Sequence, residues 1–424
     1  MAPNLIGSTF LIAETAITNN NNDANNNKQA TLAKGTCKTA TSNNDRVPNQ
    51  GESAAAISRQ NSAKPVAQTQ NKADTTTQKP YKMEIVWFNV FLFVLLHSSA
   101  LYGVWLIWAE NAYLEFVIGY FYAILGGLGI TAGVHRLWSH RAYKAKLPLR
   151  IFLMLCQSLA FQNSIYEWCR DHRVHHKFTD TNADPHNSGR GFFFAHMGWL
   201  MCKKHSDVRE RGKCIDMSDI LADPVVQFQR KYYFVVMPIC CFVLPALFPY
   251  FVLGSSLQVC FFVCSMLRYA LSLHGTWLVN SAAHFYGMRP YEKNISSVDS
   301  KFVSIIAFGE GWHNYHHVFP WDYKAGELGA YKHNWTTAFL DLMARIGQAY
   351  DLKSVSQELI LKRLQRTGDG SHYSLHDLNN NNVNINQLVS KLDHEKEDTM
   401  IWGWDDTDIS SEDRKGALYE NKEE

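Results

Sequence analysis

Eight histidines stand in three short motifs whose spacings suit metal binding. The motifs are His135-Arg-Leu-Trp-Ser-His140, His172-Arg-Val-His175-His176 and His313-Asn-Tyr-His316-His317. In the second and third motifs, the spacing i, i+3, i+4 places three imidazoles on one face of a helix. A neutral imidazole binds Fe, Zn, Cu or Ni through a ring nitrogen. Each of these two helices is therefore predicted to supply half of a two-metal site.

The first motif spaces its two histidines differently. On an α-helix, side chains five positions apart point about 140° away from each other. His135 and His140 can therefore face one metal centre only where the helix ends or bends. The apolar run before this motif stops at Val134, so we expect the transmembrane helix to end there.

Carboxylates offer a different kind of two-metal site. Soluble di-iron bundles use paired Glu-x-x-His units, with further glutamates on facing helices. Glu310-Gly-Trp-His313 matches such a unit once, and the sequence contains no partner unit. We therefore expect Glu310, and acidic neighbours such as Asp171, to accept the second N–H of metal-bound imidazoles. A single histidine motif would more often be a surface coincidence or a core residue, but three at these spacings favour a metal site.

Four apolar stretches must position the histidine motifs. A hydrocarbon layer of about 30 Å is crossed by about 20 helical residues. The stretches at about 85–108, 116–134, 232–253 and 257–278 are long enough. The sequence therefore predicts an all-α integral membrane protein, with four transmembrane helices in two hairpins and a cytosolic helical domain that holds the di-metal site.

Charge predicts how these helices are oriented. The link 109–115 contains no Lys or Arg, whereas the segment 135–231 carries many basic residues. Basic loops stay on the cytosolic side, so both termini and the histidine motifs are predicted to be cytosolic. Two polar side chains inside the spans, His97 and Arg268, are expected to make hydrogen bonds between helices.

Composition divides the chain into three parts. Residues 1–80 are rich in Asn, Thr and Gln, and we expect a disordered extension because they carry too little apolar surface to offset the entropy of ordering. Residues 81–373 are expected to form the membrane domain, and residues 374–424 are expected to be a polar, acidic, disordered tail with no catalytic role.

The net charge of +2 argues against a nucleic-acid partner. The nine cysteines include no CxxC pair and are expected to be reduced.

The motifs together resemble those of the acyl-CoA desaturases, of the stearoyl-CoA desaturase type found in animals and fungi. The resemblance covers about residues 80–373 and includes Ala183-Asp-Pro-His-Asn187, Gly191-Phe-Phe-Phe-Ala-His196, Trp277-Leu-Val-Asn-Ser-Ala-Ala-His284 and Thr367-Gly-Asp-Gly-Ser-His372. It implies an enzyme of the endoplasmic reticulum membrane. Such an enzyme inserts a cis double bond, here expected at carbon 9 of a saturated fatty acyl-CoA, using O2 and two electrons.

The resemblance also implies a set of site residues. Nine histidines would hold two Fe2+ ions, with an asparagine that reaches the second metal through water. These residues are His135, His140, His172, His175, His176, His284, His313, His316 and His317, with Asn280. Basic side chains suit the phosphates of CoA. The implied substrate contacts are Asn163, Arg170, Lys203, Lys204 and Trp277, although Lys203 and Lys204 also suit a solvated or lipid-facing patch.

Two features of the spans bear on substrate choice. His274 stands where the family usually has Asn, and we expect it to line or adjoin the acyl tunnel beside Trp277. Trp312 also departs from the family pattern, which commonly has Phe at that position. Small residues on the second span would leave room at the end of the tunnel, although close helix packing explains glycines there at least as often. These residues are Gly119, Ala123, Gly126 and Gly127.

The electrons are expected from a separate protein. Fungal relatives carry a fused cytochrome b5, but no His-Pro-Gly-Gly haem motif occurs here. The expected donor is membrane cytochrome b5 with its NADH-dependent reductase.

Two alternatives to a desaturase remain at this point. One is a related histidine-cluster enzyme such as a hydroxylase or sphingolipid desaturase, and the other is a metal transporter or a protein with a structural zinc site. A transporter needs ligands near the bilayer midplane, whereas these lie at or beyond the cytosolic boundary.

Overall fold

The computed structural model describes residues 83–327, 331–372 and 400–422. Within these ranges the chain is mostly helical, with two small two-stranded sheets and no closed sheet. Residues 1–80 and 374–399, where the sequence predicts an extension and most of a tail, lie outside the described residues.

Four helices are long and apolar enough to cross a membrane, as the sequence predicts. Their outer surfaces expose large apolar side chains such as Phe91, Leu101 and Phe251, as a lipid-facing surface requires. The second and fourth helices extend past their predicted bounds at the ends that carry His135 and His284. The four helices consist of α2 (Trp87–Ala109); α3 (Tyr113–Leu128) with η1 (Gly129–Ser139); α9 (Pro224–Pro238), η4 (Ile239–Val243) and α10 (Leu244–Leu253); and α11 (Leu257–Val259), η5 (Cys260–Leu267), α12 (Arg268–Asn280) and α13 (Ala282–Phe285).

Close helix contacts and a buried arginine join the spans. A Cβ atom at Gly103 would lie 2.5 Å from the carbonyl oxygen of Phe262, so only glycine allows α2 to approach η5 this closely. The guanidinium of Arg268 donates to the carbonyl oxygens of Leu159 at 3.0 Å and Cys241 at 2.5 Å. The ring nitrogens Nε2 of His97 and His274 lie 3.1 Å apart. Both hydrogen-bonding predictions are therefore confirmed.

The second span does not end at Val134, which corrects the expectation from the sequence. It continues to Ser139 as the π-helix η1, in which backbone bonds run from residue i+5 to residue i. The His140 amide accordingly donates to the His135 carbonyl oxygen at 3.1 Å. His135 and His140 are thus joined by one π-helical turn and lie toward the same side, without a break in the helix.

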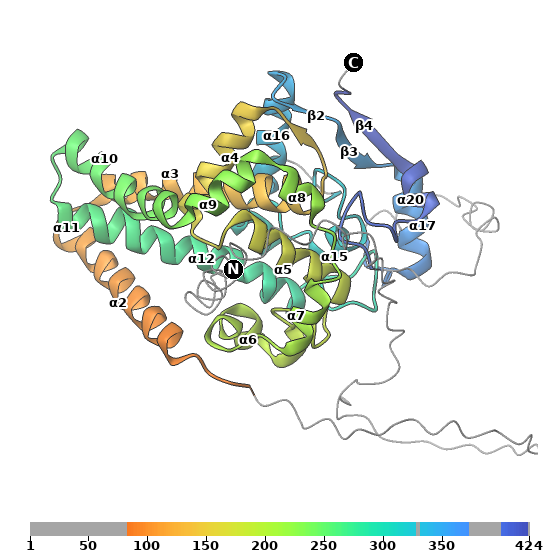
Figure 1. Ribbon diagram of the computed structural model, residues 1–424, viewed down its shortest axis with the longest axis horizontal. Helices are drawn as coiled ribbons and strands as arrows, with labels where there is room; N and C mark the ends of the chain where they lie inside the picture. The colour runs from red at the N-terminus through yellow and green to blue at the C-terminus, as the bar shows by residue number, and fades with distance from the viewer. Residues whose placement is uncertain (1–82, 328–330, 373–399, 423–424) are drawn as a thin grey trace, which may run out of the picture. The chain divides into compact units, whose positions relative to one another are not determined.

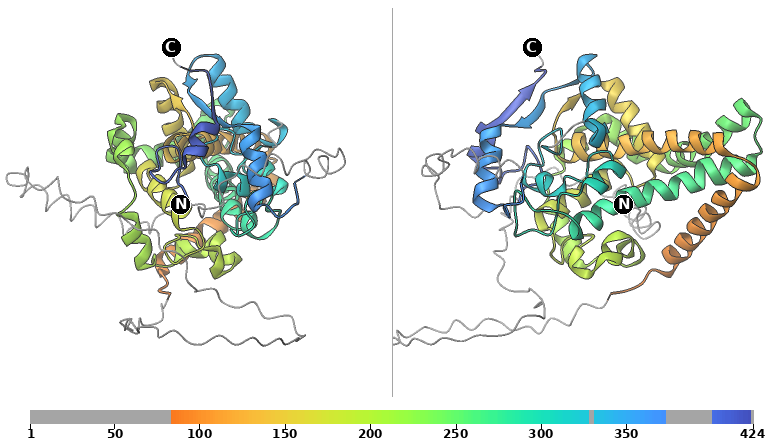
Figure 2. Two further views of the ribbon diagram at one scale, coloured as in Figure 1. Left: turned by 90° about the vertical axis from the view of Figure 1, so that its right-hand side faces the viewer. Right: turned by 180° about the vertical axis from the view of Figure 1, so that it is seen from behind.

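Shorter elements surround the inner ends of the spans. In Figures 1 and 2, the spans run toward one end of the described fold, and α15, α17 and α20 lie at the other. Ser164 caps α5 by accepting from the Glu167 amide. These elements are α4 (Leu147–Ala160), α5 (Ile165–Phe178), η2 (Ser188–Arg190), α6 (Phe192–His196), η3 (Gly198–Met201), α7 (Ser206–Gly212), α8 (Ser218–Ala222), α14 (Lys301–Ile306), α15 (His313–Val318), η6 (Tyr331–His333), α16 (Trp335–Arg345), α17 (Gln357–Thr367) and α20 (Ser411–Gly416), with strands β1 (Lys144–Ala145), β2 (Ala349–Tyr350), β3 (Leu352–Val355) and β4 (Ala417–Glu420).

Residues 400–422 are folded, contrary to the expected polar tail. Strand β4 pairs antiparallel with β3, with Leu352 opposite Glu420 and Val355 opposite Ala417. Ile401, Trp402 and Ile409 are buried. The average polarity of the tail concealed these few large apolar residues, whose burial offsets the cost of ordering the segment.

Candidate metal centre

Nine buried histidines form two groups at the inner ends of the spans. Each of these residues is at most 6% exposed. The first group takes its members from η1 and the residue after it, from α5 and from α15, and the second from α5, α13 and α15. Within each group the candidate ligand atoms lie within 4.8 Å of one another. The five-histidine group is His135, His140, His172, His176 and His316, and the four-histidine group is His175, His284, His313 and His317.

Each HxxHH motif divides its histidines between the two groups, which corrects the expectation that one helix serves one half of the site. On α5, His172 and His176 join the five-histidine group and His175 joins the other. On α15 the assignment is reversed, because His316 joins the five-histidine group while His313 and His317 do not. One helical turn thus positions ligands for both groups at once.

The imidazoles face one another through their Nε2 atoms. In the five-histidine group, Nε2 of His316 lies 2.9 Å from that of His135 and 3.1 Å from that of His176. In the four-histidine group, Nε2 of His313 lies 3.1 Å from that of both His284 and His317. A ring whose Nδ1 carries the proton has a lone pair at Nε2, and converging lone pairs require a cation between them.

Several Nδ1 atoms have partners that favour this tautomer. Nδ1 of His135 lies 2.7 Å from Oε2 of Glu310, as the sequence predicts. Nδ1 of His175 lies 2.9 Å from Oδ1 of Asp184, and Nδ1 of His284 lies 2.6 Å from Oγ of Ser296. Nδ1 of His140 lies 2.5 Å from the carbonyl oxygen of Trp402. Metal-bound imidazoles are commonly oriented by such partners.

Electrostatics keeps six of the nine histidines neutral and Glu310 ionised. Burial first, and neighbouring imidazoles second, lower the imidazole pKa well below its ordinary value of 6.5. Burial alone would raise the pKa of Glu310, but Arg136 and His135 outweigh it and hold the pKa below its ordinary value. Neutral imidazoles are the form that binds metal, so the residues fit a two-metal centre. The histidines with a lowered pKa outside the spans are His140, His172, His176, His313, His316 and His317.

Comparison with known proteins identifies the family. Residues 111–328, about half of the chain, match the family model described as fatty acid desaturase. The chain belongs to the fatty acid desaturase family. It is 50% identical over 345 residues to an acyl-CoA Delta-9 desaturase of Acheta domesticus, which covers 81% of this chain and 89% of that protein.

Two further relatives agree on the activity and differ on the bond. An acyl-CoA Delta12-desaturase of Acheta domesticus is 51% identical over 345 residues, again 81% of this chain and 89% of that protein. The stearoyl-CoA desaturase of Homo sapiens is 54% identical over 293 residues, 69% of this chain and 81% of that protein. The chain is thus an acyl-CoA desaturase, and the position of the double bond differs among its relatives.

In this desaturase an apolar cavity of about 420 Å³ lies between the spans. Its lining includes Glu310, the partner of His135, so the cavity reaches a residue that contacts the histidine site. Gln162 and Thr276 also line it and are joined by a 2.8 Å hydrogen bond. Neither residue is among the site residues predicted from the sequence. The four small residues of the second span all line the cavity: Gly119, Ala123, Gly126 and Gly127.

Close packing explains these glycines as well. A Cβ atom at Gly127 would lie 2.2 Å from the Phe308 ring, and one at Gly119 would lie 3.3 Å from the Cα of Cys264. The two interpretations of the small residues are therefore compatible, because the same positions touch neighbouring elements and border the cavity.

His274 is not among the residues that line this cavity, and its expected place lining or adjoining the acyl tunnel stays a prediction. It lies beside Trp277 as predicted, with ring centroids 5.0 Å apart, but its Nδ1 faces Nε2 of His196 at 3.0 Å. The cavity is bordered by other positions of α12, among them Gly275 and Thr276. Trp277 is fully buried and is likewise absent from the cavity lining.

The four residues expected at the CoA head group differ in burial and in their partners. Arg170 and Lys204 both contact the carboxylate of Asp171. Burial acts to raise the pKa of Asp171, but Lys204 and Arg170 outweigh it and leave the pKa below its ordinary value. Lys203 pairs with Glu84 at the surface, whereas Asn163 is buried. Asp171 therefore holds basic side chains, and the expectation that it orients an imidazole is wrong.

Three partners of the candidate metal centre are not among the residues predicted from the sequence. Asp184 stands within the Ala183-Asp-Pro-His-Asn187 motif, where its proximity in sequence to His175 was an available signal. Ser296 lies in a loop and carries no distinguishing pattern. The contact from Trp402 uses a backbone carbonyl, which any residue possesses, so no residue type could have revealed it.

Proposed function

We propose that this desaturase uses two iron ions, O2 and two electrons to insert a cis double bond at carbon 9 of a saturated fatty acyl-CoA, for unsaturated fatty acid synthesis. The observation that supports this most is that Glu310 both lines the apolar cavity and contacts His135 of the histidine centre. No side chain oxidises an unactivated methylene, so the bound metals supply that chemistry. The chain's own residues bind the substrate, orient it and exclude water.

The donor set supports iron. Nine imidazoles without a carboxylate ligand suit a first-row transition metal. The four-histidine group has one ligand fewer, and Asn280 lies one helical turn before His284. Within the described residues, the buried Nδ2 atom of Asn280 has no hydrogen-bond partner. We infer that Asn280 completes this group through a water molecule.

Substrate binding divides into a charged part and an apolar part. Arg170, Lys203 and Lys204 provide basic groups for the CoA phosphates, and Asp171 holds two of them in place. We assign Asn163 and Trp277 to the same substrate path, as the family resemblance implies. The acyl chain occupies the cavity, and the distance from the anchored CoA to the metals selects the bond.

The closed end of the cavity limits chain length. Ala123 precedes His135 by 12 residues, roughly 18 Å along the helix at 1.5 Å per residue. Replacing Ala123 by Leu should shift the preferred substrate to shorter chains. Val117→Leu is the matched control, because Val117 lies on the same helix and is exposed. An unchanged chain-length profile in Ala123→Leu would contradict this role.

We further propose that cytochrome b5 and its NADH-dependent reductase supply the electrons at the endoplasmic reticulum membrane, with both chain termini cytosolic. The basic residues of the segment 135–231 support this orientation. An acidic donor that docks on this surface should reduce the enzyme more slowly as salt rises.

Expression in desaturase-deficient cells tests the proposal. Mass spectrometry that locates double bonds would report the activity, chain length and position together. We expect a carbon-9 product, whereas hydroxylated or unaltered fatty acids would overturn the proposal. A carbon-12 product is the second candidate, because a Delta12-desaturase of Acheta domesticus is as similar to this chain as a Delta-9 enzyme of that species.

A further inference from the structure

The C-terminal strap, residues 400–409, lies directly against one candidate metal ligand. The Trp402 carbonyl oxygen is 2.5 Å from Nδ1 of His140, and the Trp404 amide donates to the His140 carbonyl oxygen at 3.0 Å. A Cβ atom at Gly403 would lie 2.5 Å from the same carbonyl oxygen. The strap therefore approaches His140 backbone to backbone, and Gly403 is the residue that permits this approach.

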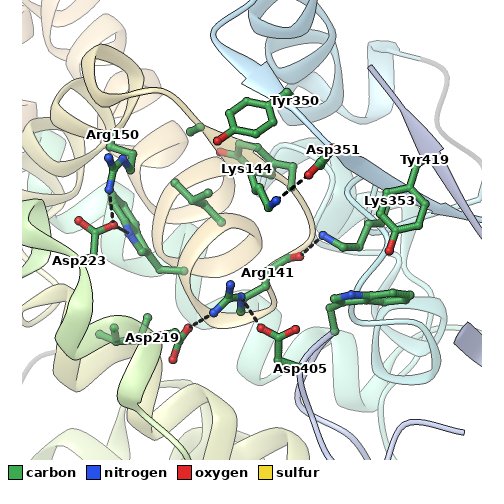
Figure 3. A pocket seen from close by; sticks show the side chains of 16 residues that line it. Arg141, Lys144, Arg150, Asp219, Asp223, Tyr350, Asp351, Lys353, Asp405 and Tyr419 are labelled. Carbon is green, nitrogen blue, oxygen red and sulfur yellow. Dashed lines mark hydrogen bonds and ion pairs between the residues drawn. The ribbon is translucent and has the colours of Figure 1, made fainter. Parts of the chain in front are cut away.

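The strap is fastened to two of the three helices that carry members of the five-histidine group, α5 and the end of η1. The Arg173 guanidinium on α5 stacks 3.9 Å from the Trp402 ring centroid. Lys177, also on α5, pairs with Asp406 at 2.9 Å. Beyond the end of η1, Arg141 pairs with Asp405 at 2.6 Å. Figure 3 shows Arg141 between Asp405 and Asp219 in a charged pocket of about 570 Å³ beside the strap.

Asp406 holds the strap in the conformation that presents the carbonyl group. Its carboxylate accepts from the Trp402 amide at 2.8 Å and from the Asp408 amide at 3.0 Å. The Asp406 side chain is 2% exposed, so these bonds are shielded from water. The orientation of the Trp402 carbonyl thus depends on Asp406.

We propose that the C-terminal strap positions the five-histidine group, with the Trp402 carbonyl as the acceptor that fixes the His140 ring and leaves its Nε2 free to bind metal. The proposal rests on the two-metal function proposed above. Among the nine site histidines, His135, His175 and His284 also have described acceptors at Nδ1. These acceptors come from residues 184–310. Among the described residues, the strap is the segment beyond residue 399 that brings such an acceptor, and the site histidine that it contacts, His140, belongs to the five-histidine group.

Two variants of the full chain test this role. Gly403→Val places a side chain where the His140 backbone lies, and Asp406→Ala removes the acceptors that shape the strap. Loss of such a partner typically costs about 10- to 100-fold in metal affinity. We expect one of the two irons to leave for a chelator roughly 10- to 100-fold faster in Gly403→Val, with a smaller increase in Asp406→Ala. The second iron should leave at the wild-type rate.

Glu412→Gln is the control, since Glu412 lies in α20 and pairs at the surface with Lys362. It should release iron as the wild type does. Wild-type release of both irons in both test variants would overturn the proposal, and so would equal acceleration of both irons. Iron retention is measured apart from desaturation. A wild type that holds two irons but forms no double bond would therefore overturn the proposed function and leave the strap proposal standing.

Discussion

The two histidine groups differ in the partners that hold their ligands. The five-histidine group is held by an ionised carboxylate, Glu310, and by a backbone carbonyl, that of Trp402. The four-histidine group is held by Asp184 and by the hydroxyl of Ser296. Glu310 also pairs with buried Arg136, so the first group is tied to an ion pair in the core. The difference implies that the same kind of change should have unequal effects on the two groups.

Adjacent ligands on α15 provide the largest contrast. His316→Ala should remove iron from the five-histidine group and His317→Ala from the other, because these neighbours belong to different groups. Each variant should keep about one of two irons and lose more than roughly 100-fold in activity, since even partners of metal ligands cost about 10- to 100-fold. Elemental analysis and product quantification check this. Loss of both irons in either variant would mean that the groups do not bind independently.

Replacing the carboxylate partners should also affect the two histidine groups unequally. Glu310→Gln removes the charge that faces both His135 and Arg136, leaving a buried cation without its counterion. Breaking a buried pair costs about 3–5 kcal/mol, and the loss of a ligand's partner costs about 10- to 100-fold in iron affinity. We expect Glu310→Gln to lower both the unfolding temperature and the iron content.

Asp184→Asn is the matched change in the four-histidine group. The Asp184 carboxylate contacts His175 and lies 3.5 Å from Nδ1 of His186, without a lysine or arginine partner among the described salt bridges. Iron affinity should therefore fall while the unfolding temperature changes less than in Glu310→Gln. Equal destabilisation by the two variants would contradict the difference between the groups.

The spacing of the histidines and the four apolar stretches were sufficient to predict that eight histidines gather at one site and to predict the spans. Spacing defines which face of a helix carries His172, His175 and His176, but not which neighbouring helix each ring meets. That depends on packing between α5 and α15, which lie far apart in sequence. The π-helix at His135 is likewise a product of packing, because the local sequence also suits a helix that ends at Val134. His284 stands alone in sequence, so only the family resemblance pointed to it.

A neutral partner should have a smaller effect. Ser296→Ala removes the hydroxyl that lies 2.6 Å from Nδ1 of His284 and donates to Asp180 at 2.7 Å. A hydrogen bond of this kind contributes about 0.5–1.5 kcal/mol, or up to roughly tenfold in affinity. Chelator competition should show faster loss from the four-histidine group only. Ser296→Thr keeps a hydroxyl and should retain more iron than Ser296→Ala.

Asp299 should affect the two groups alike, because it supports the helix that carries ligands of both. Its Oδ1 accepts from the backbone amides of Asn314 at 2.9 Å and Tyr315 at 3.2 Å, in the first turn of α15. Burial raises the pKa of Asp299 to about 7. An unfolded aspartate ionises near about 3.9, so between these values the native state binds more protons and the free energy of unfolding falls as pH rises.

Asp299→Asn should remove this dependence, which is at most about 1.4 kcal/mol per pH unit between roughly pH 4 and 7. Thermal unfolding of the metal-free protein at pH 5 and pH 7 measures it. The lowered pKa of the buried histidines makes both proteins more stable as pH rises over this interval, and the wild type should gain less stability than the variant because Asp299 opposes the gain. The difference in iron release between the two groups should stay at its wild-type value, because α15 moves His313, His316 and His317 together. A variant that released iron from one group alone would show that α15 does not couple the groups.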